Sequence, residues 1–213
     1  FRLARSGVAT AAFQMLRDVG ALDVLVPILE QYLGPEDDIP ERAEPFWDLL
    51  AALDAHVQSG DHEPPSSGLI VALLFLLPYE MELARRAKDA EPLDNRARLD
   101  AAWELLDSIA ERTRLPKKDF TRARKALVAQ QNFVAPPERF SEILFARSEE
   151  FMDAFLLFQL RSQARGVGLD IVEAWRDRAE RARAAGGDQL DEERKKTRKR
   201  RRRRRRRGGR QDR

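Results

Sequence analysis

The amino-acid sequence predicts an all-α protein, with an irregular body of many helices followed by a disordered Arg-rich C-terminal tail. Three observations predict this class. Along almost every segment apolar residues recur at intervals of three and four, as they do on one face of a helix, and no stretch alternates convincingly like a strand. Pro, Gly and Ser stand where these segments begin and end. The last segment consists almost entirely of Lys and Arg and has no apolar side chains to bury.

We expect three parts along the chain. Residues 1–33 form the end of a helical segment, residues 34–185 form a helical body, and residues 186–213 form the tail. Roughly 185 residues precede the tail, enough for one sizeable domain with a core of its own. The chain has no Cys, which excludes disulfides and thiolate metal sites. Its longest apolar run, LIVALLFLL at residues 69–77, is too short to span a bilayer and is typical of a buried core helix.

The first part predicts two helical stretches. One face of the first stretch is expected to be buried and carries apolar residues at helical spacing: Val8, Ala12, Met15, Leu16 and Val19. Gly20 can end this helix in the left-handed conformation. The next stretch has leucines at positions spaced for burial: Leu22, Leu25, Leu29 and Leu33. Because Pro27 cannot donate a backbone hydrogen bond, we expect a short turn there that leads into a new helix.

The body begins after the loop GPEDDIP. Pro45 is expected to open a helix with apolar residues on one face: Phe46, Leu49, Leu50, Leu53 and Val57. The clearest loop of the body, residues 59–68, follows, and Ser66 or Ser67 can cap the helix after it. That next helix is apolar nearly all round up to Pro78, which predicts that it is the central element of the fold.

Later helices are marked by apolar spacing and by residues that favour helix starts. One helix is indicated by four apolar positions: Leu99, Trp103, Leu106 and Ile109. Pro116, Pro137 and Asp170 lie near the starts of three others. In the segment FMDAFLLFQL three rings are expected along one buried stripe: Phe151, Phe155 and Phe158. Gly186 and Gly187 then release the tail.

The charges are distributed very unevenly. Residues 194–213 contain 15 of the 39 Lys and Arg but only one of the 36 acids, Asp212, a net charge of +14. The residues before them carry 24 Lys and Arg against 35 acids, a net charge of −11. Attraction to a polyanion must therefore come from the tail or from local patches on the body.

The tail segment RKKTRKRRRRRRRR, residues 194–207, has Thr197 as its one uncharged residue. Its thirteen cations are predicted RNA contacts: Arg194, Lys195, Lys196, Arg198, Lys199, Arg200, Arg201, Arg202, Arg203, Arg204, Arg205, Arg206 and Arg207. Guanidinium groups bind phosphates and stack on bases, and each phosphate contact releases counterions, which favours a nucleic acid as partner. With no apolar residue, the segment is expected to be disordered when free. A nuclear-localisation run, a contact with a heparin-like polymer or an anionic membrane, and a solubility tail remain open as alternatives.

A second cationic segment lies within the body, in LPKKDFTRARKALVAQQNF. On a helical projection five cations fall within roughly 160° of arc. They are Lys117, Lys118, Arg122, Arg124 and Lys125. A separate arc that can pack inward carries Phe120, Ala123 and Leu127. The cationic stripe can follow the phosphates of an RNA. Equally, it can be a solvated helix face that is balanced by acids from neighbouring helices.

No catalytic or metal-binding pattern is found. His56 and His62 lie six residues apart, and neither has a carboxylate or a second His four positions further on, so we expect no metal site. The sequence has no Gly-rich phosphate loop, no G-x-S-x-G and no H-E-x-x-H. Its carboxylates stand on predicted solvent faces, where acids and Arg usually form weak surface pairs.

Several segments, in order, resemble the C-terminal part of bacterial poly(A) polymerases and of their relatives, the CCA-adding enzymes. VATAAFQMLRDVGALDVLVPILEQYL resembles the segment that closes the neck, and GLIVALLFLLPYEMELA the central body helix. LPKKDFTRARKALVAQQ resembles the basic body helix, RFSEILFARSEEFMDAFLLFQLRSQA the next helix pair, and IVEAWRDRAERA the Trp-bearing helix before the tail. An Arg-rich tail is typical of the poly(A) polymerases and usually lacking in CCA-adding enzymes. The resemblance covers essentially the whole chain.

The resemblance implies a parent enzyme of the class II nucleotidyltransferase family that adds AMP from ATP to RNA 3′ ends in the bacterial cytoplasm. Its head would bind Mg²⁺ and ATP with a Gly-Ser pair and an Asp-x-Asp, and this sequence contains neither. A helical pattern also starts at Phe1 with no capping residue before it. We therefore expect the end of the neck, the body and the tail of a larger protein, with no catalytic residue and no cofactor of its own.

RNA 3′ ends are the expected partners, bound through their phosphates without sequence preference, and proteins of RNA decay are further candidates. No membrane contact is expected. Two alternatives stay open: a freestanding helical adaptor that binds RNA or a ribonucleoprotein, and a fragment of a CCA-adding enzyme.

Overall fold

The computed structural model describes residues 2–34, 40–61, 63–88, 93–135 and 140–208, without the side chains of residues 40–42, 88, 188 and 199–208. Within these ranges the chain forms helices and no strand, which confirms the predicted all-α class. The helices are α1 (Arg2–Arg5), α2 (Ala9–Asp18), α3 (Ala21–Leu25), α4 (Pro27–Leu33), α5 (Pro40–Gln58), α6 (Ser67–Lys88), α7 (Asn95–Thr113), α8 (Lys117–Val134), α9 (Glu142–Ala146), α10 (Phe151–Arg165), α11 (Leu169–Ala184) and α12 (Gly187–Gly208).

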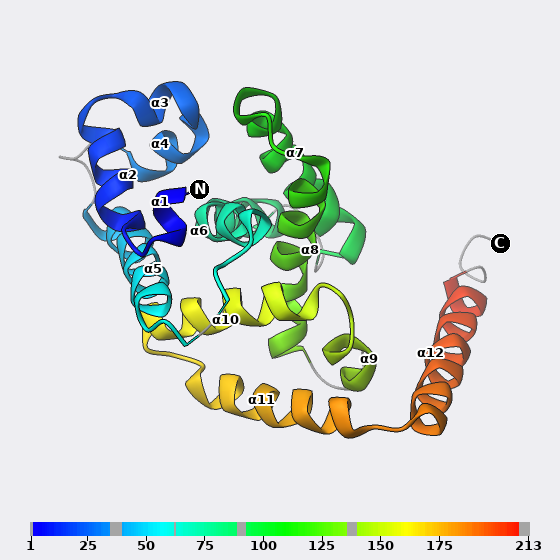
Figure 1. Cartoon of the computed structure of the whole chain (residues 1–213). Coiled ribbons are helices and arrows are strands. Elements are labelled where there is room, and N and C mark those ends of the chain that lie inside the picture. Colours follow the sequence, from blue (N-terminus) through cyan, green and yellow to red (C-terminus); the bar gives the residue numbers. More distant parts are fainter. Residues whose placement is uncertain (1, 35–39, 62, 89–92, 136–139, 209–213) are drawn as a thin grey trace.

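Helix α6 is the central element, as the sequence predicts. Figure 1 shows it between α1–α5 on one side and α7 and α8 on the other, with α10 and α11 beneath. Every residue of its apolar run, 69–77, is buried. Ser66 caps it by accepting a hydrogen bond from the Leu69 N–H at 3.0 Å. Helix α6 is long and apolar enough to cross a membrane, but 67% of the relevant window is buried inside the body, as in a core helix.

Helices α6 and α8 approach each other closely at Gly68. A Cβ atom at this position would lie 2.7 Å from the Arg122 Cβ and 2.9 Å from the carbonyl oxygen of Asp119. Only glycine leaves room for that approach. The start of α6 therefore fixes the position of α8 at the residues that carry the cationic stripe.

A second, aromatic cluster joins the end of α8 to α9, α10 and α11. Phe133 lies at its centre and stacks on Phe158 with ring centroids 4.7 Å apart. The indole N–H of Trp175 donates to the carbonyl oxygen of Phe133 at 3.0 Å, so this buried polar group is satisfied. Phe151 and Phe158 are buried, and Phe155 packs partly buried against them. The predicted stripe of rings is confirmed.

The predicted buried face of the first helix is wrong in part: Val8 is 42% exposed, whereas Leu16 packs partly buried against the core. Met15 and Val19 are 67% and 70% exposed. Asp54 of α5 accepts hydrogen bonds from the backbone N–H groups of Ala9 and Thr10, at 2.6 and 2.9 Å, and so caps α2 from another helix. These two hydrogen bonds fix the rotation of α2 about its own axis. As a result, residues at positions i, i+4 and i+7 face the core. They are Ala9, Phe13 and Leu16.

The predicted boundaries mostly hold. Gly20 adopts φ +69°, Pro27 begins α4, and α8 follows directly after Pro116. The expected start at Pro45 is wrong, because α5 begins at Pro40 and contains Pro45. Pro40 already supplies a helical φ at the first position, and a proline five residues later removes only one further backbone hydrogen bond.

Two other expectations have different outcomes. Of the four leucines expected to be buried in the second stretch, Leu25 is 44% exposed, and the other three are buried. The expected helix start at Pro137 lies outside the described residues.

The Arg-rich end of the chain continues from α11 into α12 after Ala185 and Gly186. Figure 1 shows α12 standing out from the body at the end of α11. Its described packing is against α9. Arginines spaced three and four residues apart repel each other along a helix. Disorder of the arginine run in the absence of a polyanion stays a prediction about the chain in solution.

Candidate nucleic-acid interface

The predicted inward arc of α8 is confirmed and orients the cationic stripe. Phe120, Ala123 and Leu127 are all buried against the core. The opposite side of α8 therefore faces solvent and the start of α10. Four of the five cations that the sequence singled out lie there, together with acids at and just before the start of α10.

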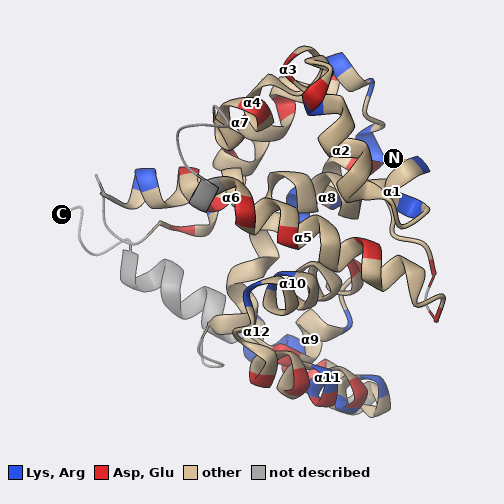
Figure 2. Ribbon diagram, turned by 90° about the vertical axis from the view of Figure 1, so that its left-hand side faces the viewer, with Lys and Arg blue, Asp and Glu red and all other residues tan. Residues whose placement is uncertain are grey.

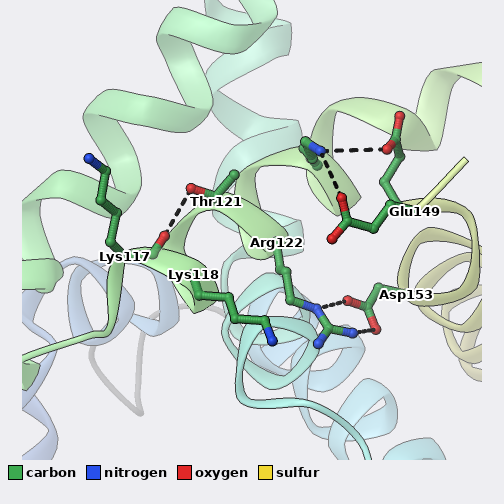
Figure 3. A pocket seen from close by; sticks show the side chains of 8 residues that line it. Lys117, Lys118, Thr121, Arg122, Glu149 and Asp153 are labelled. Carbon is green, nitrogen blue, oxygen red and sulfur yellow. Dashed lines mark hydrogen bonds and ion pairs between the residues drawn. The ribbon is translucent and has the colours of Figure 1, made fainter.

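A cavity of about 330 Å³ lies between α8 and the start of α10 (Figure 3). Four of the five predicted cations line it, with one hydroxyl and three carboxylates: Lys117, Lys118, Thr121, Arg122, Lys125, Glu149, Glu150 and Asp153. The structure thus brings together most of the predicted stripe. It also supplies the acids from neighbouring elements that the sequence left as an alternative.

Arg122 is neutralised by Asp153 through two hydrogen bonds. Its Nε donates to Oδ2 at 2.7 Å and its terminal nitrogen donates to Oδ1 at 3.1 Å. These bonds raise the pKa of Arg122 above its ordinary value. The Asp153 side chain is 13% exposed, so most of the pair is shielded from water. Arg122 would have to leave this carboxylate before it could bind a phosphate.

Lys125 also faces acids, but more loosely. Its Nζ lies 3.8 Å from a Glu149 carboxylate oxygen and 3.7 Å from one of Glu150. At these distances the attraction is electrostatic, without a well-formed hydrogen bond. The charge of Lys125 is therefore partly compensated on the protein.

Lys117 and Lys118 are exposed, and across the described ranges neither forms an ion pair. The Thr121 hydroxyl donates to the Lys117 carbonyl oxygen at 2.9 Å, a bond from a side chain to the preceding turn of α8. Figure 3 shows the Lys117 ammonium pointing away from the three carboxylates. Both ammonium groups can therefore reach an anionic ligand without breaking a contact.

Arg124 departs from the predicted stripe. It does not line the cavity; its guanidinium lies over the ring of Trp103 on α7, 5.3 Å from the ring centroid. Among the described residues it has no carboxylate partner. We call Lys117, Lys118 and Arg124 the three uncompensated cations.

Trp103 was missed as a candidate interface residue, because in the sequence it is one of four apolar positions that mark a helix. It is 47% exposed. On a helical projection it stands 40° beyond Leu99, at the edge of the face that Leu106 and Ile109 continue, at about 100° per residue. That edge position was the one signal in the sequence.

We call the cationic tail segment, residues 194–207, the arm. The residues just before it are held by the segment around α9. Ser141 donates its hydroxyl proton to a Glu193 carboxylate oxygen at 2.8 Å, and Glu193 also pairs with Lys196 at 2.9 Å. Arg147 donates to the Ala185 carbonyl oxygen at 3.0 Å, just before α12 begins. Figure 2 shows Lys and Arg interspersed with Asp and Glu along α11. The arm sequence that follows has a single sign of charge.

The comparisons with known proteins give one match. A family model described as the polymerase A arginine-rich C-terminus matches residues 90–208, more than half of the chain. The matched range runs from α7 to α12 and so contains the cavity, Trp103 and the arm. No curated protein and no solved structure matches the chain.

Proposed function

This chain belongs to the family of the polymerase A arginine-rich C-terminus, and we propose that it holds RNA for a poly(A) polymerase. In the parent protein a nucleotidyltransferase head would add AMP from ATP to RNA 3′ ends, in a bacterial cytoplasm. The body and the arm would keep the 3′ end within reach of that head. Proteins of RNA decay are proposed as further partners.

The observation that carries the proposal is the position of the cations relative to the family match. The matched residues contain both the three uncompensated cations and the thirteen cations of the arm. The residues before the arm carry a net negative charge and would repel a polyanion. The arm must therefore overcome that repulsion, and the uncompensated cations of α8 supply fixed contacts beside it.

The arm and the body have different tasks in this proposal. Ser141 holds Glu193, and the ~20 residues that follow have, as a flexible segment, a reach of about 25 Å. The arm binds phosphates of any sequence and raises the local RNA concentration. The cations of α8 then determine where the RNA strand lies, because they are carried by a helix whose opposite face is buried.

No catalytic step is assigned to this chain. The described residues hold no group of three or more side chains suited to a metal ion, and the full sequence has no Asp-x-Asp. Phosphoryl transfer between nucleotides usually depends on cations held by carboxylates. The Mg²⁺ and ATP of the parent's reaction therefore belong to the proposed head.

Binding of the chain to a labelled 20-nucleotide oligoadenylate, measured by fluorescence anisotropy from 50 to 200 mM salt, tests the proposal. We expect tight binding that weakens steeply with salt and resists competition by vesicles with anionic headgroups. Failure to bind, or preference for the vesicles, would overturn it. With ATP and Mg²⁺ added, the same RNA should not be extended, and extension would overturn the assignment of the chemistry to a separate head.

A further inference from the structure

Trp103 of α7 has a half-exposed indole. The proposed phosphate contacts give this ring no role. It stands edge-to-face against Phe120 of α8, with ring centroids 4.9 Å apart and planes at 72°. Phe120 is buried, so its ring cannot move away. Arg124 lies over the same indole at 5.3 Å. Trp103 is thus held in place by a core ring and a guanidinium while about half of its surface meets water.

The surroundings of Trp103 are polar. Within α7 and α8 the exposed large apolar side chains are Trp103 and Val134, and Val134 is the last residue of α8. Phe120 places Trp103 near the beginning of that helix. A protein partner that docks through apolar contacts needs a contiguous patch, and these two residues do not form one. One exposed planar ring surrounded by charged side chains is suited to bind one planar group of a ligand.

Two of the uncompensated cations share one face of α8. Lys117 and Arg124 are seven residues apart, which places them on one face of the helix about 10 Å apart along its axis. Phe120, which supports the indole, lies between them in the sequence. On the face of α7 that carries Trp103, the acids one turn away are Asp100, which faces Arg96 at 3.9 Å, and Asp107. Phosphates are therefore favoured along α8 and disfavoured along α7.

We propose that Trp103 is a stacking platform for an unpaired nucleobase of an RNA strand whose phosphates lie on Lys117 and Arg124. The inference rests on the proposed RNA-holding function and adds to it a contact with a base. Stacking of one base on an aromatic ring contributes about 1–3 kcal/mol and tolerates any base, because every base has a π face. The ring costs little entropy when it binds, since it is already fixed in place.

The platform gives the interface a property that phosphate contacts do not have. Ammonium and guanidinium groups bind the backbones of single-stranded and duplex RNA alike. Only an unpaired base can leave its neighbours and lie on an indole, because the bases of a duplex are stacked inside it. Trp103 therefore selects a single-stranded segment, the form that a 3′ end must take to be extended.

The test compares the full chain with three variants. Trp103→Leu removes the ring, Trp103→Phe keeps a smaller one, and Trp47→Leu removes a partly buried tryptophan from α5, outside the family match. Each protein is titrated with the 20-nucleotide oligoadenylate and with a 20-base-pair RNA duplex at the same salt. Circular dichroism and thermal unfolding establish that the variants keep their helices.

We expect Trp103→Leu to lose about 5- to 150-fold in affinity for oligoadenylate. Its salt slope and its affinity for the duplex should be unchanged, and Trp103→Phe should lose less. An equal loss for the duplex, or the same loss in Trp47→Leu, would overturn the platform by showing a general effect on structure. Unchanged oligoadenylate binding by Trp103→Leu would overturn it as well while leaving the proposed function standing. Absence of RNA binding by the unaltered chain would instead overturn the proposed function.

Discussion

The stripe on α8 and the arm in α12 carry the same kinds of cation in opposite electrostatic settings. On α8, Lys125 faces carboxylates of the segment that leads into α10, and Arg122 is bound by Asp153 of α10 through two hydrogen bonds. In the arm thirteen cations are followed by a single acid, Asp212. Part of the stripe therefore stabilises the fold through ion pairs, whereas the arm carries a large excess of positive charge.

This difference shows why a count of cations overestimates a binding surface. A cation that already has a carboxylate partner must give it up before it can bind a phosphate, so its net contribution to affinity is small. Of the five predicted residues of the stripe, three keep their charge available: Lys117, Lys118 and Arg124. The arm should therefore dominate the affinity, and the stripe should determine where the RNA lies.

The largest expected effect follows from removing the arm. A chain that ends at Glu193 keeps the hydrogen bond between Ser141 and Glu193 and loses all thirteen cations. If the arm engages six to ten phosphates of a single strand, the affinity of the full chain for RNA falls by roughly 300-fold to 10,000-fold between 50 and 200 mM salt. The shortened chain should lose most of that slope and unfold at nearly the same temperature. If it kept the full salt slope, the binding surface would lie on the body and the comparison would be wrong.

A smaller effect separates the two halves of the stripe. The double variant Lys117→Gln/Lys118→Gln should reduce the slope of log affinity against log salt by about 1.4, because each phosphate on a single strand contributes about 0.7. The matched variant Arg122→Gln/Lys125→Gln removes the same charge from compensated positions. It should change the slope by less than half as much. Equal changes in the two variants, measured by anisotropy, would contradict the distinction between compensated and uncompensated cations.

The carboxylate itself provides a test with the opposite sign. Asp153→Asn keeps the shape of the side chain and releases Arg122, which gains the freedom to bind a phosphate. RNA affinity should rise about fourfold at 0.15 M salt. The free energy of unfolding should fall by about 1–2 kcal/mol, and the unfolding temperature by about 2–8 °C, because two charge-assisted hydrogen bonds are weakened. Reduced RNA affinity in this variant would show that Arg122 does not approach RNA even when it is free.

How much of the structure can be predicted from the sequence depends on how far apart along the chain the interacting residues lie. The inward arc of Phe120, Ala123 and Leu127 and the cap at Ser66 follow from neighbours within a few residues, and both are found as predicted. The rotation of α2 does not, because it depends on Asp54, 45 residues away from Ala9 along the chain.

The same holds for the candidate interface. The sequence identifies the cations of α8, but the acid that neutralises Arg122 lies 31 residues further on. Arg124 lies over an indole from a different helix and does not line the cavity. Periodicity shows which residues share a face of one helix. It does not show which side chains of other helices will meet that face, and these decide the charge that remains for a ligand.

The smallest expected effect concerns cations that serve the fold alone. Glu82 on α6 accepts hydrogen bonds from Arg85, at 2.7 and 2.8 Å, and from Arg86 at 2.6 Å. The bonds from Arg85 and then from Arg86 lower the pKa of Glu82 from 4.5 to about 2. Arg86 also donates to Glu104 of α7 at 2.6 Å, which ties the two helices together. This cluster lies outside the cavity and the arm, so it is a control for both.

The sign of the pH dependence follows from that lowered pKa. Above about pH 4.5 Glu82 is ionised in the folded and the unfolded chain, so the stabilisation by its arginines is fully present. As the pH falls toward 2, the unfolded chain takes up the proton first, and the stabilisation is lost. Glu82→Gln should therefore lower the free energy of unfolding by about 1 kcal/mol at pH 7, a value reduced for solvent screening. Urea unfolding at pH 7, 5, 3 and 2 should show this difference shrinking toward zero at the lowest pH. RNA affinity at pH 7 should stay unchanged, because Arg85 and Arg86 lie outside both the cavity and the arm. A change of RNA affinity in Glu82→Gln would show that arginines outside the stripe and the arm reach the RNA, and the contrast between the stripe and the arm would then need another cause.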